Sequence, residues 1–333
     1  MAPRDDPLDQ IAALSPAAYE LPKWLVEPAV RSCRLFNTAL DFIFYDVPTL
    51  RAALAEKDAP MQARGRKRPS RIIDFDALSD PEGSLLLIDA TTAPYVHRYR
   101  SVKKFLESPY QESRDVEIAT ITGVGSSALG SAALAWDISV ALNEPALAIV
   151  PGFGVADVVL QALGGWFAFG LHDLLGSKTL IQTGLAATAP ETARIGRELA
   201  ASTPHEPTAP GGAPIFRYGS GSSDVLHALL EHRARPFRLV VGHSKGALQI
   251  ANAIQSLPTE RTLGLRVVTL GCPIAENVAG VDYHQYLGLF DALGQLNAWG
   301  HCPDHWPPTW HSTNPALPPA MAAGEMTCES VRD

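Results

Sequence analysis

Ser244 lies in a stretch whose residue types and spacing fit nucleophilic chemistry. An apolar run begins at Phe237, the segment Gly242-His243-Ser244-Lys245-Gly246 follows, and apolar residues then recur at helical spacing as far as Ile254. This pattern predicts a strand, a sharp turn and a helix. A serine on such a turn has a strained backbone and an exposed hydroxyl, above a helix N-terminus that can stabilise an oxyanion. The implied chemistry is attack of a serine hydroxyl on an acyl carbonyl.

The glycines on either side of Ser244 belong to the same prediction. Gly242 and Gly246 lack the side chain that would keep the helix from approaching the strand closely. The competing interpretation is an ordinary strand-to-helix corner in which the serine only caps the helix.

The elements that must position this serine alternate between strand and helix from Val116 onward. Such alternation is typical of a mainly parallel sheet with helices on both faces, so we predict the α/β class. We expect strands at 116–122, 146–150, 178–182, 237–242, 265–273 and 285–290, and helices at 128–142, 186–202 and 224–232.

The first 110 residues carry a different pattern. Helical patterning with aromatic residues extends from Leu8 to about Glu56, interrupted by prolines, and short strands are expected at 71–75 and 84–89. These residues predict a helical segment that leads into the sheet, and we assign no chemistry to them.

The length of 333 residues fits one large catalytic domain after this N-terminal segment. We place the segment at 1–110 and the domain at 111–333. Proline, glycine and serine are frequent near the end of a lid-like insertion at about 183–221. In the apolar region 145–175, glycines, prolines and charged residues break any membrane span. Its aromatic cluster at Trp166 predicts either buried core or a lipid-facing lid.

Composition narrows the class of protein. The net charge of −8 argues against nucleic-acid binding. The four cysteines form no CxxC pair, which favours a reducing compartment, and the N-terminus shows no apolar leader, so we expect a cytoplasmic protein.

The stretch around Ser244 resembles the nucleophile elbow of the α/β-hydrolase superfamily. The expected strand 265–273 ends in a Gly-x-Pro turn and is similar to the lipase strand that follows the nucleophile helix. The resemblance covers about 116–315 and implies the α/β-hydrolase fold, a Ser-His-Asp triad and an acyl-enzyme intermediate. Lys245 departs from it, because many lipases have an apolar or small residue there. Its charge is expected to alter the preference for acyl groups.

In this superfamily the triad acid lies at a strand end, after the serine and before the histidine. Asp291 is therefore the implied acid, because it directly follows the expected strand 285–290. Its competing role is the N-cap of a helix that starts at Ala292. Asp282 and Asp304 are alternative acids.

The implied base is His311, which lies among small polar residues suited to a loop. His305 is its main rival, because geometry rather than spacing decides such triads. His301, Cys302, Asp304 and His305 also form a possible metal cluster, but no second ligand pair stands at a recognisable spacing. We expect no metal and no cofactor.

Two turns compete to complete the oxyanion hole with the N–H of Lys245. The turn Pro151-Gly152-Phe153-Gly154 resembles the His-Gly-Phe-Gly turn of many α/β-hydrolases, which favours Gly152 and Phe153 slightly. The turn Gly123-Val124-Gly125-Ser126 resembles the strand-end turn of class 3 lipases and makes Val124 and Gly125 the alternative. A dinucleotide site at this second turn is disfavoured, because a third glycine and a following acidic residue are out of register.

The function that the resemblance implies is hydrolysis of a carboxylic ester, as in lipases and esterases. The expected partner is a small-molecule, lipid or polyester acyl substrate, with contact to a lipid or membrane surface as a further expectation and no nucleic acid. Two alternatives stay open. The same triad serves an acyltransferase or thioesterase, and a non-catalytic binding protein can retain the fold.

Overall fold

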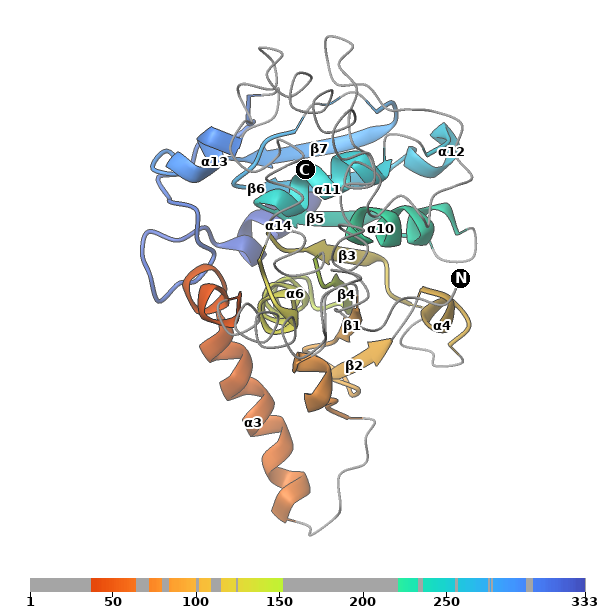
Figure 1. The fold of residues 1–333 in the computed structure, drawn as a ribbon, viewed down its shortest axis with the longest axis vertical. Coiled ribbons are helices and arrows are strands. Elements are labelled where there is room, and N and C mark those ends of the chain that lie inside the picture. Colours follow the sequence, from red (N-terminus) through yellow and green to blue (C-terminus); the bar gives the residue numbers. More distant parts are fainter. Residues whose placement is uncertain are drawn as a thin grey trace, which may run out of the picture.

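The computed structural model of the chain describes its central sheet and most of the helices that cover it (Figure 1). The residues described are 37–63, 72–79, 84–99, 102–108, 115–123, 125–151, 221–232, 236–254, 257–274, 276, 278–297 and 302–332. The strand expected at 178–182, the helix expected at 186–202, the aromatic cluster at Trp166 and nearly all of the expected insertion 183–221 lie outside them.

The elements alternate between strand and helix along most of the described chain. After a helix at 37–44 they are α3 (Val47–Ala63), η2 (Phe75–Ser79), β1 (Leu85–Ile88), β2 (Val96–Tyr99), α4 (Val102–Leu106), β3 (Ile118–Ile121), α6 (Ala128–Leu142), β4 (Ala146–Ile149), α10 (Gly221–Glu231), β5 (Leu239–His243), α11 (Lys245–Ile254), α12 (Thr259–Thr262), β6 (Leu265–Leu270), β7 (Val281–Tyr286), α13 (Ala292–Asn297) and α14 (Ala323–Arg332).

The strands form one seven-stranded sheet in the order β2-β1-β4-β3-β5-β6-β7, which Figure 1 shows from bottom to top. β1 is antiparallel to both β2 and β4, and the other neighbours are parallel. The α/β class with a mainly parallel sheet is therefore confirmed.

Helices cover both faces of this sheet. One face packs against α4, α10 and α11, and the other packs against α3, α6 and α14. Alternate residues of a strand point to opposite faces. Leu85 and Leu87 of β1 accordingly join the first core, while Leu86 and Ile88 join the second. Burial on both faces explains why these strands are continuous apolar runs in the sequence.

The helix expected at 128–142 is confirmed as α6, and its ends have clear local causes. Ser127 caps the N-terminus, with its hydroxyl accepting the Leu129 N–H at 3.1 Å. Asn143 ends the helix in the left-handed conformation, with φ of 56°.

Two expected strands are wrong. In the described part of the segment expected at 71–75, a single bridge joins Ile73 to Val96, and η2 begins at Phe75. The last strand is not 285–290 but β7, four residues earlier. β7 lies at the edge of the described sheet and carries polar residues such as Asp282 and His284, so its sequence lacks the apolar run of a central strand.

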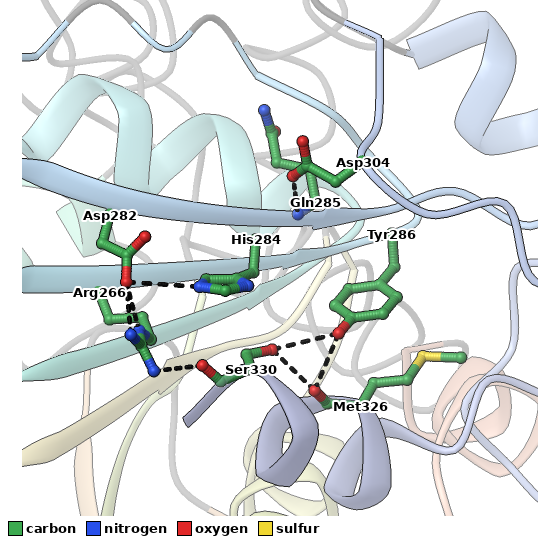
Figure 2. A network of polar contacts seen from close by, with 8 residues as sticks. All are labelled: Arg266, Asp282, His284, Gln285, Tyr286, Asp304, Met326 and Ser330. Atoms are coloured by element: carbon green, nitrogen blue, oxygen red, sulfur yellow. Dashed lines mark hydrogen bonds and ion pairs between the residues drawn. The ribbon is translucent and has the colours of Figure 1, made fainter. Parts of the chain in front are cut away.

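Polar contacts fasten β7 and α14 to the rest of the sheet (Figure 2). Arg266 on β6 pairs with Asp282 on β7 at 2.6 Å and also donates to the carbonyl of Ser330 in α14. The Tyr286 hydroxyl lies 3.2 Å from the Met326 carbonyl and 3.3 Å from the Ser330 hydroxyl. These contacts hold the C-terminal helix against one face of the sheet.

Within the described part of the chain, no helix is long and apolar enough to cross a membrane.

The helix α11 approaches the sheet so closely that two positions exclude any side chain. A Cβ atom on Gly246 would lie 2.2 Å from the Ile121 carbonyl oxygen, and one on Gly242 would lie 2.7 Å from the Ala247 nitrogen. Both obstacles are backbone atoms, which cannot rotate away. The steric role predicted for these glycines is therefore confirmed.

We expect Gly246→Ala to lower the free energy of unfolding by about 3 kcal/mol, because the added methyl forces α11 away from β3. Urea denaturation followed by circular dichroism measures the loss.

Gly264→Ala is the control for this substitution. Gly264 has φ of +75°, and a methyl group added there would meet no atom within 4 Å, so only backbone strain of about 1 kcal/mol is expected. Equal losses in the two variants would contradict the packing argument.

Candidate active site

Ser244 occupies a strained turn between β5 and α11. Its φ is +54°, a conformation that costs a non-glycine residue about 1–2 kcal/mol. The Ser244 N–H donates to the Leu270 carbonyl on β6 at 2.7 Å, and the close packing of α11 holds the turn in place. Backbone strain at a serine that follows a central strand is an observation that points toward function.

Asp291 and His311 form a buried pair beside the end of β6. His311 Nδ1 lies 2.8 Å from each carboxylate oxygen of Asp291. The aspartate is 1% exposed and the histidine 5%. Because an ionised carboxylate only accepts, Nδ1 carries the proton and donates, which leaves the lone pair on Nε2. A histidine in this tautomer is oriented to act as a base through Nε2.

Asp291 also caps α13, so both roles considered for it in the sequence occur together. The Gly294 N–H donates to Asp291 Oδ1 at 2.6 Å. Two glycines make room for the pair. A Cβ atom on Gly271 would lie 2.9 Å from Asp291 Oδ2 and 3.0 Å from His311 Nδ1, and one on Gly294 would lie 2.4 Å from Asp291 Oδ2.

The loop that carries His311 is fastened to the end of the helix at 37–44. The last carbonyl groups of a helix have no partner within it and need an external donor. Three side chains supply these donors: Ser312 to Ile43 at 2.6 Å, Thr313 to Phe44 at 2.8 Å, and Asn314 to Phe42 at 2.7 Å. The small polar residues that indicate a loop in the sequence are thus the anchors of that loop.

Gly123, in the turn after β3, lies against Ser244. A Cβ atom on Gly123 would lie 2.9 Å from Ser244 Cβ and 3.2 Å from its Oγ. β3 pairs directly with β5, whereas β4 lies one strand further away. The strand order therefore favours the turn at Gly123 as the candidate for the second oxyanion donor. The sequence alone slightly favours the turn at 151–154 for this role. Gly152, Phe153 and Val124 lie outside the described residues.

Several backbone N–H groups of the turn after β3 already donate hydrogen bonds within the protein. The N–H groups of Gly123, Ser126 and Ser127 donate to Tyr45, Gly123 and Asp41 respectively. Of the residues of this turn that the structure describes, Gly125 is therefore the candidate for an oxyanion donor, and the amide of Val124 lies outside the described residues. Lys245, the other candidate, is the first residue of α11, so its amide lies in the first turn of that helix.

Asp41 holds the N-terminus of α6 and, with it, the turn after β3. Its carboxylate accepts the Ser126 hydroxyl at 2.8 Å, the Ser127 N–H at 3.1 Å and the Ser127 hydroxyl. Burial raises the pKa of Asp41 to about 7, against the hydrogen bonds from the two serines, which lower it.

Tyr45 and His243 link this turn to the His311 loop. The Tyr45 oxygen lies 2.8 Å from the Gly123 nitrogen and 2.9 Å from His243 Nδ1. His243 Nε2 lies 2.7 Å from the His311 carbonyl oxygen. Burial, followed by the neighbouring His311, lowers the pKa of His243 to about 3, so the ring is neutral.

Tyr45 and Asp41 belong to the N-terminal residues to which the sequence assigned no chemistry. Nothing in their local pattern indicates a polar role, because their partners lie about 80 to 200 residues away in the chain. Only the tertiary structure brings Tyr45 to Gly123 and His243, and Asp41 to the two serines that precede α6.

The rival acids and bases have other contacts. Asp282 pairs with Arg266, and Asp304 accepts the Gln285 N–H at 2.8 Å. His305 stacks on Tyr286 with ring centroids 4.6 Å apart. His301 lies outside the described residues. These contacts place the rivals in the packing around β7.

Cys272 lies close enough to Lys245 and Asp291 for their charges to affect its thiol, but its burial disfavours the nucleophilic thiolate. Burial raises the pKa of its thiol to about 12, and the charge of Lys245 offsets only part of this effect. The histidines, cysteines and carboxylates that the structure describes include no group of three or more that could hold a metal ion.

Comparison with known proteins finds no matching family model, no matching curated protein and no matching solved structure.

The raised pKa of Asp41 predicts a pH-dependent stability. Between about pH 4 and pH 7 the folded state holds a proton that the unfolded chain has released, so this group stabilises the fold less as the pH rises. Asp41→Asn removes this pH-dependent contribution to stability, because the amide does not titrate. We expect the stability of the wild type relative to this variant to fall by up to about 1.4 kcal/mol per pH unit in that window, measured by urea denaturation.

Asp282→Asn is the control. Desolvation raises the pKa of Asp282, but Arg266 outweighs it and holds the pKa below the usual value. The difference in free energy of unfolding between this variant and the wild type should stay constant over the same pH window. A constant difference for Asp41→Asn would refute the raised pKa of Asp41.

Proposed function

We propose that this protein is a serine hydrolase of the α/β-hydrolase type that cleaves carboxylic esters. The observation that carries the proposal is the buried Asp291–His311 pair beside a strained Ser244 turn. A carboxylate that orients a histidine next to such a serine is the arrangement that activates a hydroxyl for attack on an acyl group.

The topology supports the proposal. The serine follows β5, a glycine turn follows the neighbouring β3, and the aspartate comes after β7. In α/β-hydrolases the residue after the nucleophile and the turn after the third strand supply the oxyanion hole, and acid and histidine follow in that order. We assign the hole to the N–H of Lys245 and to Val124 or Gly125.

In the proposed reaction, His311 Nε2 accepts the Ser244 hydroxyl proton as Oγ bonds to the carbonyl carbon. Asp291 stabilises the imidazolium that forms, and the two N–H groups bind the oxyanion. The ester C–O bond then breaks, and His311 gives its proton to the leaving alcohol. Water, deprotonated by the same histidine, then attacks the carbonyl carbon of the acyl-enzyme. The bond from this carbon to Ser244 Oγ breaks, and His311 returns its proton to Oγ, which releases the acid and restores the serine hydroxyl.

The surface around the site favours an apolar acyl group. Among the described residues, most of the exposed large hydrophobic side chains lie on segments that carry Asp291 or contact the His311 loop. They are Phe42, Ile43, Leu289, Phe290, Leu293, Trp306 and Leu317. We propose a lipid or polyester acyl chain as the substrate class, with these residues facing the chain or the lipid surface that presents it.

We expect Ser244→Ala and His311→Ala each to reduce the hydrolysis of p-nitrophenyl esters at least about 10³-fold, because each removes a reacting group. Labelling by a fluorophosphonate should be lost in the serine variant and slowed in the histidine variant.

The matched controls are Ser330→Ala and His284→Ala, which remove the same residue types from α14 and β7 and should keep the activity. A wild-type protein that neither hydrolyses any ester nor reacts with the fluorophosphonate would overturn the proposal and favour a binding role. A new ester formed when an alcohol is added would indicate acyl transfer.

The acyl preference tests the apolar surface. Phe290 is 65% exposed and adjoins Asp291, so Phe290→Ser should lower kcat/KM for an octanoate ester about three- to tenfold more than for an acetate ester.

Leu263→Ser is the control, because Leu263 is 75% exposed but lies at the opposite end of β6 from the site. An unchanged ratio between the two esters in the Phe290 variant would exclude this surface from acyl binding.

A further inference from the structure

We propose that Tyr45 and His243 are positioning residues, which hold the turn after β3 and the His311 loop in register with Ser244 through one chain of hydrogen bonds. The inference rests on the proposed function and adds two residues to the machinery of that site. Neither residue touches the reacting atoms in the proposed reaction.

The direction of every bond in the chain follows from its two ends. The His311 carbonyl only accepts, so His243 Nε2 carries a proton and donates to it at 2.7 Å. In a neutral ring Nδ1 then has the lone pair and accepts the Tyr45 O–H at 2.9 Å. The Tyr45 oxygen in turn accepts the Gly123 N–H at 2.8 Å.

The residues whose side chains form this chain of hydrogen bonds are buried. Tyr45 is 2% exposed and His243 is 1% exposed, and their rings also meet edge to face with centroids 5.3 Å apart. A buried donor or acceptor that loses its partner costs about 1–3 kcal/mol, so alternative arrangements of these groups are disfavoured. The chain therefore fixes one tautomer of His243 and one position of each loop.

Each end of the hydrogen-bond chain lies at a residue of the candidate active site. Gly123 begins the turn proposed to complete the oxyanion hole and contacts Ser244. The His311 carbonyl belongs to the residue whose ring is the proposed base, and the rings of His243 and His311 lie 5.0 Å apart. His243 itself directly precedes Ser244 in the chain. One set of contacts thus couples base, nucleophile and oxyanion turn.

The test compares Tyr45→Phe, His243→Gln and the double variant by steady-state kinetics and by the rate of fluorophosphonate labelling. Each single change breaks the Tyr45–His243 bond, so each should lower kcat about 10- to 100-fold with KM nearly unchanged. The double variant should be less impaired than the product of the two single losses, because both remove the same bond.

Tyr286→Phe is the matched control. It removes another buried tyrosine hydroxyl, whose bonds go to Met326 and Ser330 in α14 rather than to the proposed catalytic residues (Figure 2). It should lower stability while leaving kcat unchanged. If Tyr45→Phe fails to fold, His243→Gln carries the kinetic test alone.

A readout that does not depend on activity is the ¹⁵N spectrum of the His243 ring. One protonated and one unprotonated nitrogen should persist at about pH 6, below the ordinary histidine pKa. Two protonated nitrogens, or a proton on Nδ1, would contradict the proposed direction of the hydrogen bonds through His243.

The failures can be told apart. An active wild type with unchanged kcat in both single variants, or with strictly multiplicative losses, overturns this inference and leaves the proposed function standing. A wild type that shows neither turnover nor labelling overturns the proposed function and with it the positioning role.

Discussion

The contact between the first turn of α11 and the ends of β3 and β5 is the constraint on which the candidate site depends. Gly246 lies against the Ile121 carbonyl, and Gly242 lies against the Ala247 nitrogen. This approach forces the chain through a positive φ at Ser244. The strained turn is stable only because strand, helix and neighbouring strand fix it from three sides, which is the usual way in which a protein maintains local strain.

The other parts of the site are arranged around this turn by polar contacts of helix ends. Asp41 binds the N-terminus of α6, Asp291 binds the N-terminus of α13, and the residues after His311 bind the C-terminal carbonyls of the helix at 37–44. Helix ends leave backbone groups unpaired and therefore provide fixed, directional attachment points. Loops that would otherwise move relative to each other gain defined positions from them, which is the rigidity that a preorganised site requires.

Burial gives the same contacts their electrostatic character. The hydrogen-bond chain through Tyr45 and His243 is neutral, since burial keeps the His243 ring from taking up a second proton. The carboxylate of Asp41, in contrast, titrates near neutral pH. Of the groups that hold the site in place, the His243 ring thus keeps its charge state near neutral pH, whereas the Asp41 carboxyl changes its charge there.

The sequence by itself determined the alternation of strands and helices, the bounds of α6 and the turn at Ser244, because these depend on periodicity, caps and glycines that act over a few residues. It also named Asp291 and His311, the two residues that the structure brings into contact. Only the tertiary structure decided which glycine turn adjoins the serine, where the polar edge strand β7 begins, and that Tyr45 and Asp41 reach the site. These features depend on strand order and on contacts between residues far apart in the chain, and no local pattern encodes such contacts.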